Sequence, residues 1–172
     1  MCDNPSLKIA VDVHYRAEEA RAAGVLFHAW DAPGPAWNVS VEVSGTDSYQ
    51  PGEFFRRELP PIMALLDKVD PLPDVIVVDG YVCLDAEGKP GLGKYLYDAL
   101  GGKCAVIGVA KSRYRGTPVE AELRRGGSDR PLYITAAGVS QEEAKACIRK
   151  MRGGDRIPRL LKEADRLSRS WD

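Results

Sequence analysis

Residues 74–79 read DVIVVD, an unbroken apolar run that ends in an acid, and the expected architecture follows from it. A strand without polar alternation is typical of a sheet that is covered on both faces. We therefore expect a central sheet with helices on either side, in which Asp79 ends an inner strand.

On the N-terminal side of this stretch, three strands are predicted. Residues 7–15 contain IAVDVHY, in which Asp12 and His14 alternate with valines and point to one side. A second apolar run covers residues 25–30. Residues 38–43, NVSVEV, alternate strictly, as a half-buried strand does. Short turns between these three strands predict an antiparallel meander.

A helical pattern fills residues 53–69 but is interrupted by Pro60 and Pro61. Proline is tolerated in the first turn of a helix and not in its interior. We therefore expect a short helix, a kink and a second helix. The inner stripe of the second helix would be Ile62, Leu65, Leu66 and Val69.

The C-terminal half continues with alternating strands and helices. The patterns predict a helix over residues 91–100, a strand over 105–110, a strand over 132–136, and helices over 140–151 and 159–168. Ser140 and Glu143 form a capping box at the first of the last two helices. The expected fold is α/β, with one domain over residues 1–172. Its mixed central sheet has three antiparallel strands followed by parallel strands, with flanking helices.

Composition narrows the class of protein. A chain of 172 residues with 44% hydrophobic residues suits one ordinary domain, and its net charge of −1 neither favours nor excludes nucleic acid. No apolar run reaches the roughly 18 residues of a membrane span, and the N-terminus lacks a secretory core. Four cysteines without paired spacing predict reduced thiols and a cytoplasmic protein. No membrane or protein partner is inferred.

Two acids lie where apolar strands do not ordinarily hold them, Asp12 and Asp79. An isolated carboxylate there costs several kcal/mol unless it is paired or bound to a cation. Acids from two central strands converge at the carboxyl edge of a sheet, and their hard oxygens suit Mg²⁺ and phosphodiester chemistry. Alternatively, Asp79 opens an Asp-Gly turn and Asp12 caps a backbone amide.

Further segments join these two acids in one pattern. They are SYQPGEFFRRELPPIMALL over residues 48–66, AVIGVAKSR over 105–113, RIP over 156–158 and KEADRL over 162–167. With IAVDVHY and DVIVVDG they occur in order over about residues 7–165, and the chain resembles the endonuclease V family. This resemblance implies a ribonuclease-H-like fold.

The resemblance implies a metal site and a reaction. Asp12 and Asp79 would bind Mg²⁺, with Mn²⁺ as a substitute. Glu58 would bind a metal ion as well or orient the attacking water, and Lys111 would neutralise the scissile phosphate. The implied substrate is DNA or RNA that contains a deaminated base, chiefly inosine. The cut would fall one nucleotide beyond that base on its 3′ side and leave a 3′-hydroxyl and a 5′-phosphate.

The resemblance also implies nucleic-acid contacts. Tyr49, Gln50 and Pro51 would form a wedge that separates strands, and Gly80 would contact the nucleic acid. The alternative for Tyr49 is a loop tyrosine packed under the following helix.

The chain departs from the family pattern in two places. The family has a Gly-His-Arg turn after its late strand, whereas PLYITAA here runs into residues 138–140 without a histidine. The family also has a His-Pro-Arg loop, in whose place residues 85–87 read Asp-Ala-Glu. We hypothesise that His14 lies beside the metal and partly replaces the missing histidine. The alternative is a histidine whose ring is hydrogen-bonded in the core or at the surface.

Lys111 and the basic segments each allow two interpretations. Lys111 is either a phosphate contact or a solvated lysine at a strand end. The basic segments 111–115, 124–130 and 149–159 form either a phosphate-binding surface or a solvated face. The rivals to the expected activity are a nuclease of the same fold without inosine specificity and a non-catalytic nucleic-acid-binding homologue.

Overall fold

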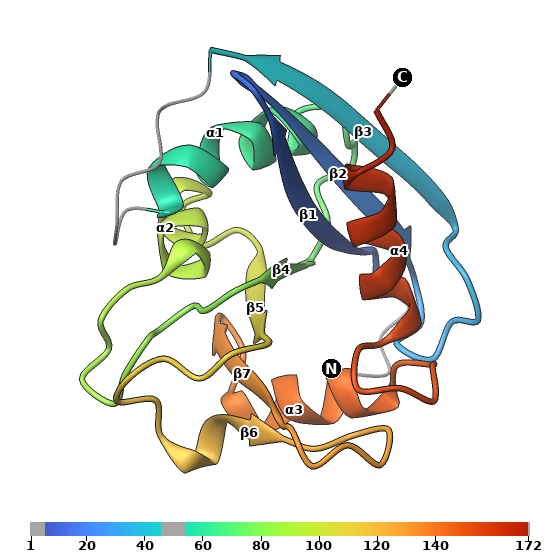
Figure 1. Cartoon of the computed structure of the whole chain (residues 1–172). Coiled ribbons are helices and arrows are strands. Elements are labelled where there is room, and N and C mark those ends of the chain that lie inside the picture. Colours follow the sequence, from blue (N-terminus) through green and yellow to red (C-terminus); the bar gives the residue numbers. More distant parts are fainter. Residues whose placement is uncertain (1–5, 46–53, 172) are drawn as a thin grey trace.

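The computed structural model describes residues 6–45 and 54–171. Within them, one seven-stranded sheet has the order β3-β2-β1-β4-β5-β7-β6 (Figure 1). The strands are β1 (Lys8–Arg16), β2 (Glu19–Phe27), β3 (Trp37–Ser44), β4 (Val75–Asp79), β5 (Ala105–Ala110), β6 (Glu122–Leu123) and β7 (Leu132–Ala137). The helices are α1 (Phe54–Leu66), α2 (Leu92–Ala99), α3 (Gln141–Lys150) and α4 (Arg159–Ser168), with a short 3₁₀ turn, η1 (Val119–Ala121).

The strand directions confirm the mixed sheet that the sequence predicts. β1, β2 and β3 form the antiparallel meander, and β4 and β5 continue the sheet parallel to β1. β7 then runs antiparallel to β5, and β6 runs antiparallel to β7. The carboxyl ends of β1, β4 and β5 therefore meet at one edge, whereas β7 ends at the opposite edge.

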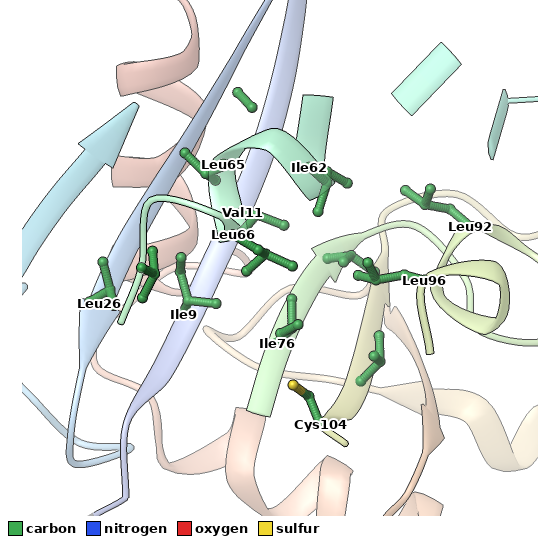
Figure 2. Packing of buried hydrophobic residues seen from close by; sticks show 14 of the residues in the cluster. Ile9, Val11, Leu26, Ile62, Leu65, Leu66, Ile76, Leu92, Leu96 and Cys104 are labelled. Atoms are coloured by element: carbon green, nitrogen blue, oxygen red, sulfur yellow. The ribbon is translucent and has the colours of Figure 1, made fainter. Parts of the chain in front are cut away.

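Two apolar cores fill the spaces on the two faces of the sheet. In β1, Ile9 and Val11 point into the core beneath α1 and α2, and Ala10 points into the core beneath α3 and α4. Figure 2 shows the first core, where side chains of α1 and α2 meet those of β1, β2 and β4. Burial on both faces explains why residues 74–79 show no polar alternation.

Helix α1 contradicts the predicted break at the two prolines. Residues 54–66 form one helix with Pro60 and Pro61 inside it. Each proline removes a backbone hydrogen bond, at a cost of about 3 kcal/mol. The predicted inner residues Ile62, Leu65, Leu66 and Val69 are all buried. At about 1.5–3 kcal/mol for each buried side chain, their packing offsets that cost and keeps the helix whole.

The cysteines depart from the expectation of reduced thiols in one case. Cys147 in α3 is disulfide-bonded, whereas Cys83 and Cys104 are free thiols. Among the helices of the described ranges, none is long and apolar enough to cross a membrane.

Candidate active site

Asp12 and Asp79 come together because β1 and β4 are parallel neighbours in register. Val11 pairs with Val78, and each acid follows its valine directly. Adjacent strands lie about 4.8 Å apart, so the two backbones present their acids side by side. Both acids line one small cavity of about 20 Å³, together with Lys111 and Ala164. The convergence expected from the sequence is thus present in the structure.

Lys111 lies on the other side of Asp79, just after β5. Its Nζ is 3.3 Å from Oδ2 of Asp79, and both side chains are about two-fifths exposed, at 41% and 42%. An exposed pair of this kind contributes at most about 1 kcal/mol. Lys111 is therefore held near the acids without being locked to them.

Asp12 has two hydrogen bonds of different kinds. Its Oδ1 accepts from the amide of Val13 at 2.9 Å, so the backbone cap considered as an alternative does exist. Its carboxyl group also shares a hydrogen bond with Asp165 of α4. Burial, and then the negative charge of Asp79, raise the pKa of Asp12 to about 7. Because this hydrogen bond lowers the pKa of Asp165, Asp12 is the donor in it.

Asp165 is a fourth acid that the sequence reasoning did not place in the site. Burial alone would raise its pKa, but Arg169 at 3.0 Å and the hydrogen bond from Asp12 hold it below the ordinary value. Its sequence signal was the Ala-Asp pair within KEADRL, which the family resemblance included without a role. Asp165 reaches the site because α4 packs across β1 and β2.

Glu58 lies on α1, which covers the face of the sheet opposite to α4 and its Asp165. Burial, and then the charges of Asp12 and Asp79, raise its pKa to about 8. The neighbouring Arg57, whose guanidinium lies 3.6 Å from the ring centre of Tyr15, has a smaller effect in the opposite direction. Glu58, Asp12 and Asp79 therefore repel one another, which is the electrostatic setting that a divalent cation relieves.

The acidic side chains are not arranged as a complete set of metal ligands. In the described part of the chain, no three acid, histidine or cysteine side chains are gathered as a metal ion requires. Asp79 is turned towards Lys111, and Asp12 is turned towards Asp165. The donor set nevertheless fits a hard cation, since all of its ligand atoms are carboxylate oxygens.

Arg156, from the RIP segment, fixes the backbone that carries Lys111. Its guanidinium donates to the carbonyls of Lys111, Pro131 and Arg130, the last two at 2.8 and 3.0 Å. A planar group with five donors suits such a cluster of carbonyls. This arginine of the basic segment 149–159 is thus structural and holds the site together.

Arg125 has a similar role in the segment 124–130. Its guanidinium donates to four carbonyls between residues 151 and 156, among them Met151 at 2.6 Å and Asp155 at 2.8 Å. Arginines of the basic segments therefore have a structural role, because they donate hydrogen bonds to backbone carbonyls. These segments are not wholly a phosphate-binding surface.

A pocket of about 560 Å³ opens beside the acids. Glu58, Asp79 and Lys111 lie at it, and its apolar walls are Leu84, Pro90, Leu92 and Ala110. Tyr81 joins two of its loops, because its hydroxyl donates to the carbonyl of Ser112 at 2.7 Å and accepts from the amide of Tyr114 at 3.0 Å. Gly80, the predicted nucleic-acid contact, also lines this pocket.

The two segments that depart from the family pattern, residues 85–87 and 138–140, lie in different parts of the structure. Residues 85–87 form a closed turn in which Asp85 accepts from the amides of Glu87 and Lys89, each at 3.0 Å. Gly138 follows β7 and packs on Ala105, where β5 begins. The turn 138–140 therefore lies at the sheet edge opposite Asp79, so a histidine there would not adjoin these acids.

The remaining predicted site residues are placed as follows. Nδ1 of His14 accepts a hydrogen bond from Nε1 of Trp171 at 3.1 Å, which agrees with the alternative of a hydrogen-bonded ring. Tyr49, Gln50 and Pro51 lie outside the described residues.

Comparison with known proteins gives one consistent family. The family model described as Endonuclease V matches residues 3–138. The endonuclease V of Thermococcus kodakarensis is 34% identical over 165 residues, covering 94% of this chain and 79% of that protein. The endonuclease V of Pyrococcus horikoshii is 31% identical over 161 residues, covering 93% and 72%.

Solved structures agree with the sequence relatives. The endonuclease V of Streptomyces avermitilis superimposes with a TM-score of 0.79 at 25% identity, over 97% of this chain and 82% of that chain. The catalytic domain of human endonuclease V gives a TM-score of 0.77 at 24% identity, over 95% and 81%, a likeness of fold.

Proposed function

The chain belongs to the endonuclease V family, and on that basis we propose that it is a metal-dependent endonuclease that cuts DNA or RNA beside a deaminated base. The proposed base is inosine, and the cut falls one nucleotide beyond it on the 3′ side. The observation that carries the proposal is that Asp12 and Asp79 lie side by side at one sheet edge. Lys111 pairs with Asp79, and the charges of both aspartates act on Glu58 of α1.

Asp12, Asp79 and Glu58 are the residues that would hold Mg²⁺ or Mn²⁺. Such an ion, when bound, lowers the pKa of a water molecule and neutralises charge that develops on the phosphate. Burial, and then the charges of neighbouring acids, raise the pKa values of Asp12 and Glu58. These shifts support the assignment, because a bound cation would favour the ionised carboxylates.

The chain's own side chains have distinct tasks in this proposal. Lys111 leaves its weak pair with Asp79 and donates to an oxygen of the scissile phosphate. Glu58 either binds the metal ion together with the aspartates or orients the attacking water. Arg156 keeps the Lys111 backbone in place through its three carbonyl bonds.

The pocket beside Gly80 supports a base-directed reaction. Its volume of about 560 Å³ is ample for an extruded base, and its walls are mostly apolar. Enzymes that recognise a single altered base take it out of the stack and pack it between apolar or aromatic groups. Tyr114 lines this pocket and offers such an aromatic surface.

The test uses labelled oligonucleotides with one inosine, as single- and double-stranded DNA and RNA, with inosine-free copies. The purified protein is incubated with Mg²⁺ or Mn²⁺, next to Asp79→Asn and to Asp98→Asn. Asp98 is a matched control, because its side chain is 58% exposed and forms a local ion pair with Lys94, at 2.7 Å, on the same helix. The proposal predicts one cut beside inosine, which Asp79→Asn abolishes and Asp98→Asn leaves unchanged.

The remaining outcomes separate the rivals. Cleavage that ignores inosine keeps the nuclease and removes the base specificity. Binding of oligonucleotide without cleavage, and without Mn²⁺ binding in a calorimetric titration, points to a non-catalytic homologue.

A further inference from the structure

His14 and Trp171 join the start and the end of the described chain at the site. The indole Nε1–H of Trp171 donates to Nδ1 of His14 at 3.1 Å, and the two rings meet edge to face with centroids 6.3 Å apart. Trp171 follows α4, the helix that also brings Asp165 to Asp12. Helix α4 and the residues that follow it therefore provide hydrogen-bond partners for both Asp12 and His14 of β1.

This hydrogen bond fixes which nitrogen of His14 carries the proton. An indole N–H can only donate, so Nδ1 has to accept and bears no hydrogen. The neutral ring then holds its proton on Nε2, where it is a donor. A metal ligand needs an unprotonated nitrogen, and the only one here is already engaged with Trp171.

The position of His14 places that donor next to the acids. His14 stands two residues after Asp12 on the same face of β1, about 7 Å further along the strand. Among the residues that the structure describes, nothing accepts a hydrogen bond from Nε2. Lys111 follows β5, so His14 and Lys111 come from the two strands that flank β4 and its Asp79.

We propose that His14 donates from Nε2 to a phosphate oxygen of the substrate strand, next to the phosphate that is cut, and that Trp171 is the positioning residue that sets this tautomer. The inference rests on the proposed function, because it deepens the description of the same site. In this proposal His14 contacts the nucleic acid and does not bind the metal ion, unlike in the hypothesis drawn from the sequence.

The cleavage test uses the full chain and the inosine oligonucleotide under single-turnover conditions at increasing protein concentration. A hydrogen bond to a phosphate that is equally strong before and during reaction affects binding and not the rate at saturation. His14→Ala is expected to raise the half-saturating protein concentration about tenfold, with little change in the saturating rate. His14→Gln keeps a side-chain N–H donor and is expected to recover most of this loss.

Two further measurements separate this contact from other roles. A neutral donor displaces no counterion, so the dependence of binding on salt should have the same slope in wild type and in His14→Ala. Nitrogen NMR of the imidazole rings should report the Nε2–H tautomer in wild type and a mixture in Trp171→Phe. That variant should also weaken binding, but less than His14→Ala.

The chain contains a matched control pair, His28 and Trp37. Their rings lie 6.1 Å apart at the sheet edge where β1 begins, and both are exposed. His28→Ala and Trp37→Phe are expected to leave half-saturation unchanged.

Each remaining outcome overturns the inference in a recognisable way. Weaker Mn²⁺ binding in His14→Ala would mean that His14 is a metal ligand. Unaltered binding in His14→Ala, with cleavage intact, removes the phosphate contact and leaves the proposed function standing. A wild-type protein that cuts no oligonucleotide removes both.

Discussion

Asp12 of β1 shares a hydrogen bond with Asp165 of α4 while it lies beside Asp79 of β4. The C-terminal helix therefore contributes to the acid cluster, although it lies beyond residues 3–138, which match the family model. Burial, and then the charge of Asp79, raise the pKa of Asp12 to about 7, so the ionisation of this site depends on pH in the neutral range.

The metal-free protein should lose stability as the pH rises from about 4 to about 8. In this window the folded chain holds protons on Asp12 and Glu58, whose pKa values are about 7 and about 8, whereas the unfolded chain has released them. Stability then falls with pH, by at most about 1.4 kcal/mol per pH unit for each group.

Thermal unfolding in EDTA across this pH range checks that prediction. Asp12→Asn still donates to Asp165 and should flatten the profile and raise Tm at pH 8. Saturating Mn²⁺ should also raise Tm at pH 8 for the wild type. A Tm that rises steadily with pH in EDTA would contradict the raised pKa values of Asp12 and Glu58.

Lys111→Met should separate metal binding from cleavage. The substitution removes a positive charge 3.3 Å from Asp79, so Mn²⁺ affinity should stay equal or increase. The cleavage rate at saturation should fall roughly 100- to 1000-fold, as for the loss of one donor to a developing charge. Calorimetry and single-turnover cleavage measure the two quantities, and a parallel loss of both would refute the assigned role.

Arg156→Lys should weaken both the fold and the site, because lysine cannot span three carbonyls. Loss of the bonds to Pro131, Arg130 and Lys111 should cost roughly 2–4 kcal/mol in the free energy of unfolding. Urea unfolding gives this value. Arg166→Lys is the control, since its guanidinium is exposed and, among the described residues, pairs only with Glu163 on its own helix. Equal stability in both variants would show that the carbonyl cluster is unimportant.

Gly108→Ala should disturb the turn that carries Asp79. A Cβ at this position in β5 would lie 2.6 Å from the carbonyl oxygen of Gly80 and 2.8 Å from Oγ1 of Thr135. We expect a loss of about 1–3 kcal/mol in stability and reduced cleavage at temperatures where the variant is folded. Gly34→Ala, where nothing lies within 4 Å, should change neither. Full activity of Gly108→Ala would mean that the turn yields without moving Asp79.

The strands and most helices could be predicted because their signals are local. Each signal depends on a few neighbouring residues. Examples are the alternation in NVSVEV, the apolar run before Asp79, and the helix cap in which Oγ of Ser140 accepts from the amide of Glu143. The prediction of two helices separated at Pro60 and Pro61 was wrong, because here the deciding interactions are not local. The burial of Ile62 and Leu65 against the sheet outweighs the local preference, and that burial is not visible in the segment itself.

Periodicity and ordered motifs along the chain were enough to establish the fold class, the family, and the candidate acids Asp12, Glu58 and Asp79. Three relationships became known only from the folded arrangement: Asp165 joins these acids, Trp171 holds the ring of His14, and Arg156 supports Lys111. Each of them links residues far apart in the chain through hydrogen bonds of fixed direction. Such bonds exist only once α4 and its preceding loop have docked on the sheet, because spacing along a sequence does not specify which polar atoms come to face one another.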